Sequence, residues 1–137
     1  MNPEQFLQSI YLGDRACKAV HIESLRRQIA IQVDVISRLK PGTKTWGFFS
    51  EADIPNGWLV FGDVRAVRFE PAGPVPNDLI NSISVKLLDP CEDSPKYLFE
   101  LSIDSVDSIG IHTEVLLQIE ASSLHIEDPK GQVSSSF

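Results

Sequence analysis

The chain has 137 residues, of which 42% are hydrophobic and 23% are charged, and its mean hydropathy is −0.03. This length and composition are enough for one globular core that needs no disulfide or metal ion. The sequence contains no apolar run near the ~18 residues that a membrane-spanning helix requires, so we expect a soluble domain without a membrane partner.

The net charge of −7 is concentrated in the second half of the chain. Residues 1–68 hold nine Lys and Arg against seven Asp and Glu (+2), whereas residues 69–137 hold three against twelve (−9). Acidic surfaces repel phosphate backbones, so we expect no direct nucleic-acid partner and a basic partner if the domain binds a protein. The alternative is that the acidity only keeps the domain soluble.

The first ten or so residues predict a short helix. Asn2 is a good N-cap, Pro3 suits the first helical position, and Gly13 suits the left-handed stop after Leu12. The segment lacks the basic start and long apolar stretch of a secretory signal, so the expected location is the cytoplasm.

The next segments predict a β-hairpin. A strand over residues 18–23 would join the following strand through a tight connection near residues 24–26. The second strand lies in "RQIAIQVDVIS", whose apolar residues alternate with polar ones at Ile29, Ile31, Val33 and Val35. A helix over residues 16–27 remains the alternative.

The stretch "DRACKAVHIES" places a thiol, an imidazole and a carboxylate close together in sequence, at Cys17, His21 and Glu23. On a strand, Cys17 and His21 would stand ~13 Å apart, which is too far for a hydrogen bond, so we do not expect a local catalytic dyad. Cys17 is expected to be a small, half-buried apolar residue, and Cys91 a second free thiol. A cysteine nucleophile served by a distant histidine is the alternative.

Further short strands follow, separated by turns. The expected strands are "WGFFS", "GWLVFGD", "VRAVRFE", "NSISVKLL", "YLFELSI", "TEVLLQIEA" and "SLHIE". Two connections are "EADIPN" and "PAGPVPND", the latter with one helical turn after Pro76. About eight strands with little helix predict an all-β fold, an antiparallel β-sandwich or partly closed barrel, as a single domain over residues 1–128. Residues 129–137 are expected to be a frayed tail.

Two features suggest binding surfaces. Two loops that flank one strand carry five acidic residues, Asp89, Glu92, Asp93, Asp104 and Asp107. They are a candidate docking surface for a basic partner, or else solvated turns. Five of the eleven aromatic residues fall within residues 46–61, and Trp46, Trp58 and Phe61 would line a ligand pocket if they are not simply core.

The sequence gives no sign of a catalytic or cofactor site. The three histidines His21, His112 and His125 lack metal-ligand spacing, so we expect them on the surface and expect no metal; a zinc site assembled across strands is the alternative. Phosphate-binding, dinucleotide-binding and hydrolase motifs are missing, so we expect no cofactor and no catalytic residue.

The segments "FLQSIYLGDRACK", "IQVDVISRL", "VPNDLINSISV" and "FELSIDSVD" resemble a family of small bacterial proteins of unknown function. More distantly, the series of short strands ending in "VLLQIEASSLHIED" is similar to β-rich immunity proteins that neutralise polymorphic toxins. These resemblances imply a non-catalytic protein-binding domain, in the form of an immunity-like inhibitor of a partner protein, and bring no functional residues. The alternatives are a small enzyme or ligand-binding protein that uses residues 46–61, and a homo-oligomer formed through a β edge.

Overall fold

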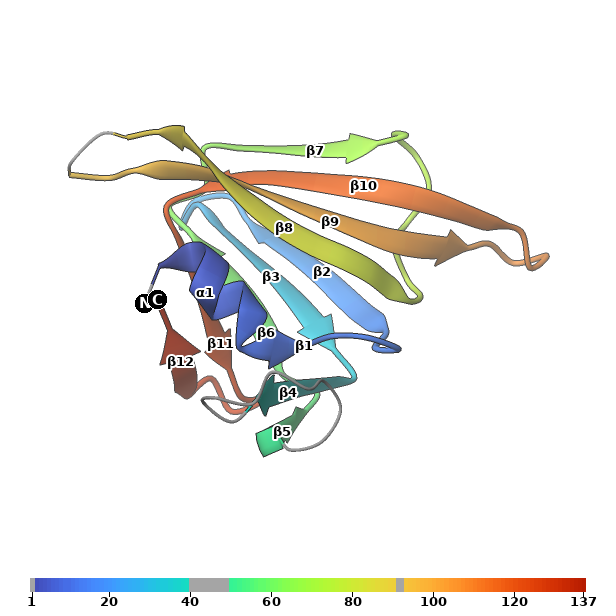
Figure 1. The fold of residues 1–137 in the computed structure, drawn as a ribbon. Helices are drawn as coiled ribbons and strands as arrows, with labels where there is room; N and C mark the ends of the chain where they lie inside the picture. The colour runs from blue at the N-terminus through green and yellow to red at the C-terminus, as the bar shows by residue number, and fades with distance from the viewer. Residues whose placement is uncertain (1, 40–49, 91–92) are drawn as a thin grey trace.

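The computed structural model describes residues 2–39, 50–90 and 93–137 (Figure 1). Its elements in chain order are α1 (Pro3–Gln8), β1 (Ile10–Tyr11), β2 (Cys17–Glu23), β3 (Gln28–Val33), β4 (Val35–Leu39), β5 (Ser50–Pro55), β6 (Trp58–Gly62), β7 (Ala66–Glu70), β8 (Ile80–Asp89), β9 (Lys96–Val106), β10 (His112–Ala121), β11 (Ser123–Glu127) and β12 (Val133–Ser136). The predicted all-β fold with a short N-terminal helix is confirmed. None of the described helical residues form a helix long and apolar enough to cross a membrane.

The strands form three antiparallel sheets. A five-stranded sheet has the order β12-β11-β6-β3-β2, a four-stranded sheet has the order β7-β10-β9-β8, and a small sheet has the order β1-β4-β5. The two larger sheets face each other as a sandwich (Figure 1). Phe61 of β6 meets Phe99 of β9 across this interface, with 5.1 Å between ring centroids.

The core comes from the strand faces that alternation predicts. Buried side chains on the five-stranded sheet are Ile29, Ile31, Val33, Leu59, Phe61, Leu124 and Ile126. Those on the four-stranded sheet are Phe99, Leu101, Ile103, Leu117, Ile119 and Ala121. Because every second residue of a strand points to the same face, the remaining side chains of these strands lie on the two outer faces of the sandwich.

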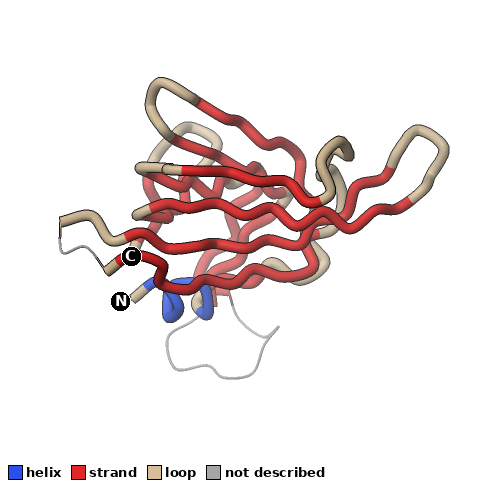
Figure 2. The backbone as a smooth tube through the Cα atoms, turned by 90° about the horizontal axis from the view of Figure 1, so that it is seen from above, coloured by secondary structure: helices blue, strands red, loops and turns tan. Residues whose placement is uncertain are grey.

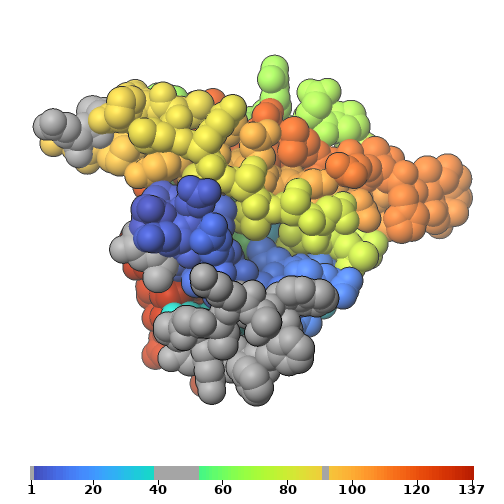
Figure 3. Space-filling model, in the orientation of Figure 1, coloured from blue at the N-terminus to red at the C-terminus, as the bar shows by residue number. Residues whose placement is uncertain are grey.

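The N-terminal helix is shorter than expected. Asn2 is the N-cap, and its side chain accepts a hydrogen bond from the N–H of Gln5 at 2.7 Å. The expected end at Leu12 is wrong, because Ile10 and Tyr11 instead pair with β4. The helix lies beside β8 and contributes Phe6 to the core (Figure 3).

The strand expected to continue from Ile29 to Val35 is two strands, β3 and β4, in different sheets. The chain bends at Asp34, whose Oδ1 accepts hydrogen bonds from the N–H groups of Ala16, at 3.0 Å, and Val35, at 2.8 Å. After the bend, β4 pairs with β5. "EADIPN", expected as a connection, is therefore mostly strand.

The last residues, expected to fray, are ordered by β-pairing. β12 pairs with β11, and the ring of Phe137 lies 5.8 Å from that of Phe6 and 5.9 Å from that of Tyr97. Both chain ends therefore lie close together (Figure 2). The segment "PAGPVPND" is a loop as expected, but without the helical turn after Pro76.

Candidate functional site

A shallow groove of about 250 Å³ lies on the outer face of the five-stranded sheet. Its floor follows from strand register: Ala30 of β3 lies beside Val60 of β6, and His21 of β2 lies on the other side of Ala30. Because the Ala30 side chain is small, it does not fill the space above it, and a hollow remains. Val60 is only 2% exposed although it points to the outer face. The sequence alternation that fills the core thus also builds this groove.

One wall of the groove is aromatic. The imidazole of His21 lies against the indole of Trp58, with 4.7 Å between ring centroids and 46° between their planes. Trp58 is paired with Glu127 of β11, which places a carboxylate next to the indole. The exposed imidazole, the partly exposed indole and the carboxylate make a surface suited to a cation that also has an apolar stem.

The groove carries more negative than positive charge. Glu23, Glu127 and Asp128 line it together with one basic residue, Arg26, so the formal charge is −2. Arg26 Nη1 lies 3.3 Å from Glu23 Oε2, and Glu127 Oε2 is hydrogen-bonded to His125 Nε2. Among the described residues, no lysine or arginine forms an ion pair with Glu127 or Asp128.

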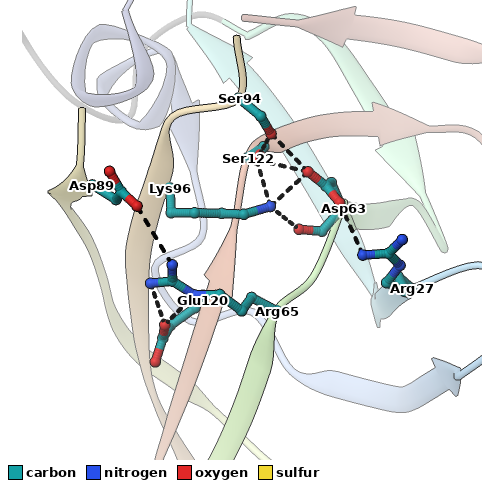
Figure 4. Close-up of polar contacts among 8 residues, drawn as sticks. All are labelled: Arg27, Asp63, Arg65, Asp89, Ser94, Lys96, Glu120 and Ser122. Carbon is teal, nitrogen blue, oxygen red and sulfur yellow. Dashed lines mark hydrogen bonds and ion pairs between the residues drawn. The ribbon is translucent and has the colours of Figure 1, made fainter. Parts of the chain in front are cut away.

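A second polar cluster joins the two sheets at one end of the sandwich (Figure 4). The ammonium group of Lys96 donates to the backbone oxygen of Asp63 at 2.8 Å, to its Oδ2 at 2.6 Å and to Ser122 Oγ at 2.9 Å. All three ammonium protons are therefore donated, which leaves no lone pair to activate Ser122 as a nucleophile. The cluster is a structural link between the start of β9 and the turn after β6.

Arg65 extends this link along the same end of the sandwich. Its guanidinium binds Glu120 Oε1 through Nη2 at 2.8 Å and Nε at 3.0 Å, and it lies 3.7 Å from Asp89 Oδ2. Arg27 approaches Asp63 at 3.9 Å from the β2–β3 turn. These contacts tie β8 and β10 to the connection between β6 and β7, and that connection to the β2–β3 turn.

We expect Asp63 to make stability depend on pH in strongly acidic solution. Hydrogen bonds lower the pKa of Asp63 from 3.8 to about 2, and the bond from Lys96 contributes more than the bond from Ser94. Because the folded pKa lies below the unfolded one, the stabilisation is complete above the unfolded pKa and is lost as pH falls through the folded pKa. Asp63→Asn should lower the free energy of unfolding by about 1 kcal/mol at neutral pH, the value of a partly exposed ion pair, and should flatten its decline between pH 4 and 2, measured by urea unfolding.

Asp14 provides the matched control. Asp14 and Asp63 both have positive φ, 57° and 51°, a conformation that asparagine tolerates. Asp14 forms no ion pair with any other residue in the described ranges, so Asp14→Asn should leave the acid dependence unchanged. Equal effects of the two substitutions would contradict the role assigned to Asp63.

The structure separates the acidic residues that sequence grouped as one docking surface. Asp89 and Asp93 lie at the β8–β9 turn, whereas Asp104 and Asp107 lie toward the β9–β10 turn, at opposite ends of β9 (Figure 1). The ten residue steps of β9 span ~33 Å. Glu92 lies outside the described residues.

Three of these acidic residues, Asp89, Asp104 and Asp107, have local structural partners. Asp104 Oδ1 accepts a hydrogen bond from Asn81 Nδ2 at 2.8 Å. Asp107 Oδ1 accepts hydrogen bonds from the N–H groups of Ile109, at 3.0 Å, and Ile111, at 2.9 Å, and so shapes the β9–β10 turn. Asp89 lies near Arg65. Asp93 is exposed.

The residues of the predicted aromatic pocket also separate. Trp58 lines the groove, but Phe61 is completely buried in the core because it points to the opposite face of β6. Trp46 lies outside the described residues. Sequence reasoning had placed His21 on a solvated face and missed its contact with Trp58, which only the pairing of β2, β3 and β6 brings about.

Cys17 is a buried thiol on β2, as the strand interpretation predicts; the alternative helix over residues 16–27 is wrong. Burial raises the pKa of Cys17 to about 11. The thiol is therefore neutral at physiological pH and is a poor nucleophile. His21 points to the outer face of the sheet, away from the core that holds Cys17.

Comparison with known proteins gives one family and no function. The "Family of unknown function (DUF6258)" matches residues 1–135. No curated protein and no solved structure matches the chain.

Proposed function

Since the chain belongs to this family of unknown function, we propose its function from the groove itself: a non-catalytic domain that binds a basic segment of a partner protein on the outer face of the five-stranded sheet. The observation that carries the proposal is the pairing of an accessible indole, Trp58, with an excess of carboxylates in one hollow. Indoles bind guanidinium and ammonium groups through their ring faces, and carboxylates bind them as ions.

The size of the groove favours a protein partner over a free small molecule. Small-molecule pockets usually enclose about 300–1,000 Å³ and bury most of the ligand, whereas this groove has about 250 Å³ and is open. It can accept one or two side chains of a larger partner. Tryptophan and arginine, present here as Trp58 and Arg26, are also the residues that most often dominate the energy of protein interfaces.

An immunity-like inhibitor is the form of this function that we propose, because a domain that covers a basic surface of its partner would block that surface by occupation alone. The net charge of −7 on this chain would speed its association with such a partner. The buried free thiol of Cys17 fits the cytoplasmic location that we propose, since reducing compartments keep thiols unpaired.

The proposal can be tested with a short synthetic peptide in which arginine alternates with glycine, and with its citrulline counterpart as the neutral control. We expect the arginine peptide to bind measurably by calorimetry and the citrulline peptide not to bind. Trp58→Ala and Glu127→Gln should each weaken binding, the former by about tenfold or more because it removes the central ring.

Glu70→Gln is the matched control, because Glu70 is an exposed carboxylate on β7 of the other sheet and its loss changes net charge by the same amount as Glu127→Gln. It should leave peptide affinity unchanged. Equal weakening by Glu70→Gln, or no binding of the arginine peptide by a folded protein, would refute the groove as the binding site.

A further inference from the structure

Three side chains with metal-binding atoms converge toward the turn end of the β9–β10 hairpin, which projects beyond the sandwich (Figures 1 and 3). The ligand atoms of Asp78, Asp104 and His112 all lie within 4.8 Å of one another. A tetrahedral zinc ion with bonds near 2.1 Å holds its ligand atoms about 3.4 Å apart. The imidazole of His112 is exposed, so its rotation about the side-chain bonds is the movement that would shorten these distances.

Backbone pairing brings the three residues together from separate parts of the chain. His112 begins β10 opposite Val106. Asp104 lies two positions before Val106 in β9, on the same face of the sheet. The N–H of Asp78 donates to the carbonyl of Asp104 at 2.9 Å, which fixes the loop before β8 against β9. Strand pairing and this loop contact thus set the backbone positions of all three residues.

Neighbouring amides fix this arrangement further. Asn81 Nδ2 donates to Asp104 Oδ1 at 2.8 Å, which orients that carboxylate. Asn77 binds both backbone groups of Val106, through Oδ1 at 2.8 Å and Nδ2 at 3.0 Å. Such outer contacts are what orient the ligands of protein metal sites.

The local charge is uncompensated. Asp78 and Asp104 are partly buried, and no lysine or arginine nitrogen of the described ranges lies within 4.0 Å of either carboxylate. Glu114 lies directly opposite Asp104 on β10, which adds a third negative charge. Like charges in this relation are unfavourable, and a bound cation would relieve them. The carboxylates of Asp63 and Glu120, by contrast, have lysine or arginine partners.

We propose that Asp78, Asp104 and His112 bind one divalent transition-metal ion, with Zn²⁺ preferred over Mg²⁺ and Ca²⁺. An imidazole with two carboxylates suits zinc, whereas magnesium and calcium prefer sites built from oxygen atoms alone. Three protein ligands leave one position for water or for a donor group of a partner. The site is on the four-stranded sheet, so this inference does not depend on the groove.

The test measures Zn²⁺ binding to the whole chain by competition with a chromophoric chelator. The background carries Cys91→Ser, because a thiolate is a strong zinc ligand and Cys91 lies outside the described residues. We expect one Zn²⁺ per chain, a higher melting temperature with Zn²⁺ than with Mg²⁺ or Ca²⁺, and a loss of affinity of about tenfold or more in Asp78→Asn and His112→Ala, since even outer-contact substitutions cost about that much.

His21→Ala and Glu114→Gln separate a built site from adventitious binding. His21 is another accessible histidine, and Glu114 adds charge without joining the converging atoms. Both should keep zinc affinity within about threefold of the parent, below the effect of an outer-contact substitution. Should Asp78→Asn fail to fold, His112→Ala remains decisive because its side chain is exposed. Unchanged zinc affinity in a folded His112→Ala chain, or equal losses in His21→Ala, would overturn the proposal.

Discussion

Replacing Phe99 by alanine should lower the free energy of unfolding by about 3–5 kcal/mol, the usual cost of removing a buried aromatic side chain. Phe99 is fully buried at the centre of an aromatic cluster. Its ring centroid lies 5.1 Å from that of Phe61, 6.2 Å from that of Tyr97 and 6.4 Å from that of Phe137. The substitution removes contacts with both sheets and with the C-terminus at once, so the cavity cannot be filled by movement of one neighbour.

Denaturant unfolding measures this effect, and Leu25→Ala is the control. Leu25 is 99% exposed, so its truncation should change stability by less than about 0.5 kcal/mol. Because Phe99 points into the core, a folded Phe99→Ala chain should retain its affinity for the arginine peptide. A destabilisation below about 1.5 kcal/mol would show that the cluster repacks around the missing ring.

The inward faces of the long strands could be predicted from sequence because their physical cause is local. In β3, β9 and β10 each buried apolar residue follows the previous one at a spacing of two, and the side-chain alternation of an extended chain needs no knowledge of the partner strand. Short strands carry too few repeats of this pattern. The sequence therefore predicts a turn in place of β5 and a tail in place of β12, and it is their pairing with β4 and β11 that orders them.

The candidate sites could not be predicted in the same way, because they depend on register between strands. The groove requires that His21, Ala30 and Val60 form one row across three strands. The sequence predicts one surface for the acidic residues beside β9 because they are close in sequence. β9 is long enough, however, to hold the residues at its two ends far apart. Asp104 and His112 could in principle have been paired, since the turn signal "DSIG" between them folds β10 back along β9.

Asp34→Ala should also be strongly destabilising, by about 2 kcal/mol or more. The Asp34 carboxylate accepts hydrogen bonds from the N–H groups of Ala16 and Val35 at the bend between β3 and β4. Both contacts are partly buried, so alanine would leave two backbone donors with little access to water, at a cost of about 1–3 kcal/mol each before relaxation. Asp34→Asn keeps an acceptor oxygen in place and should cost less than half as much.

Asp128 offers the control that separates burial from the hydrogen bonds themselves. Its Oδ1 also accepts from two backbone N–H groups, those of Lys130 and Gln132, both at 2.9 Å, but in an exposed turn. Water can replace the carboxylate there, so Asp128→Ala should cost about 1 kcal/mol or less. Urea unfolding of the three variants gives the comparison. If Asp34→Ala and Asp128→Ala were equally destabilising, the bend would be held by the packing of β4 and β5, and the carboxylate would not be what moves the chain from one sheet to the next.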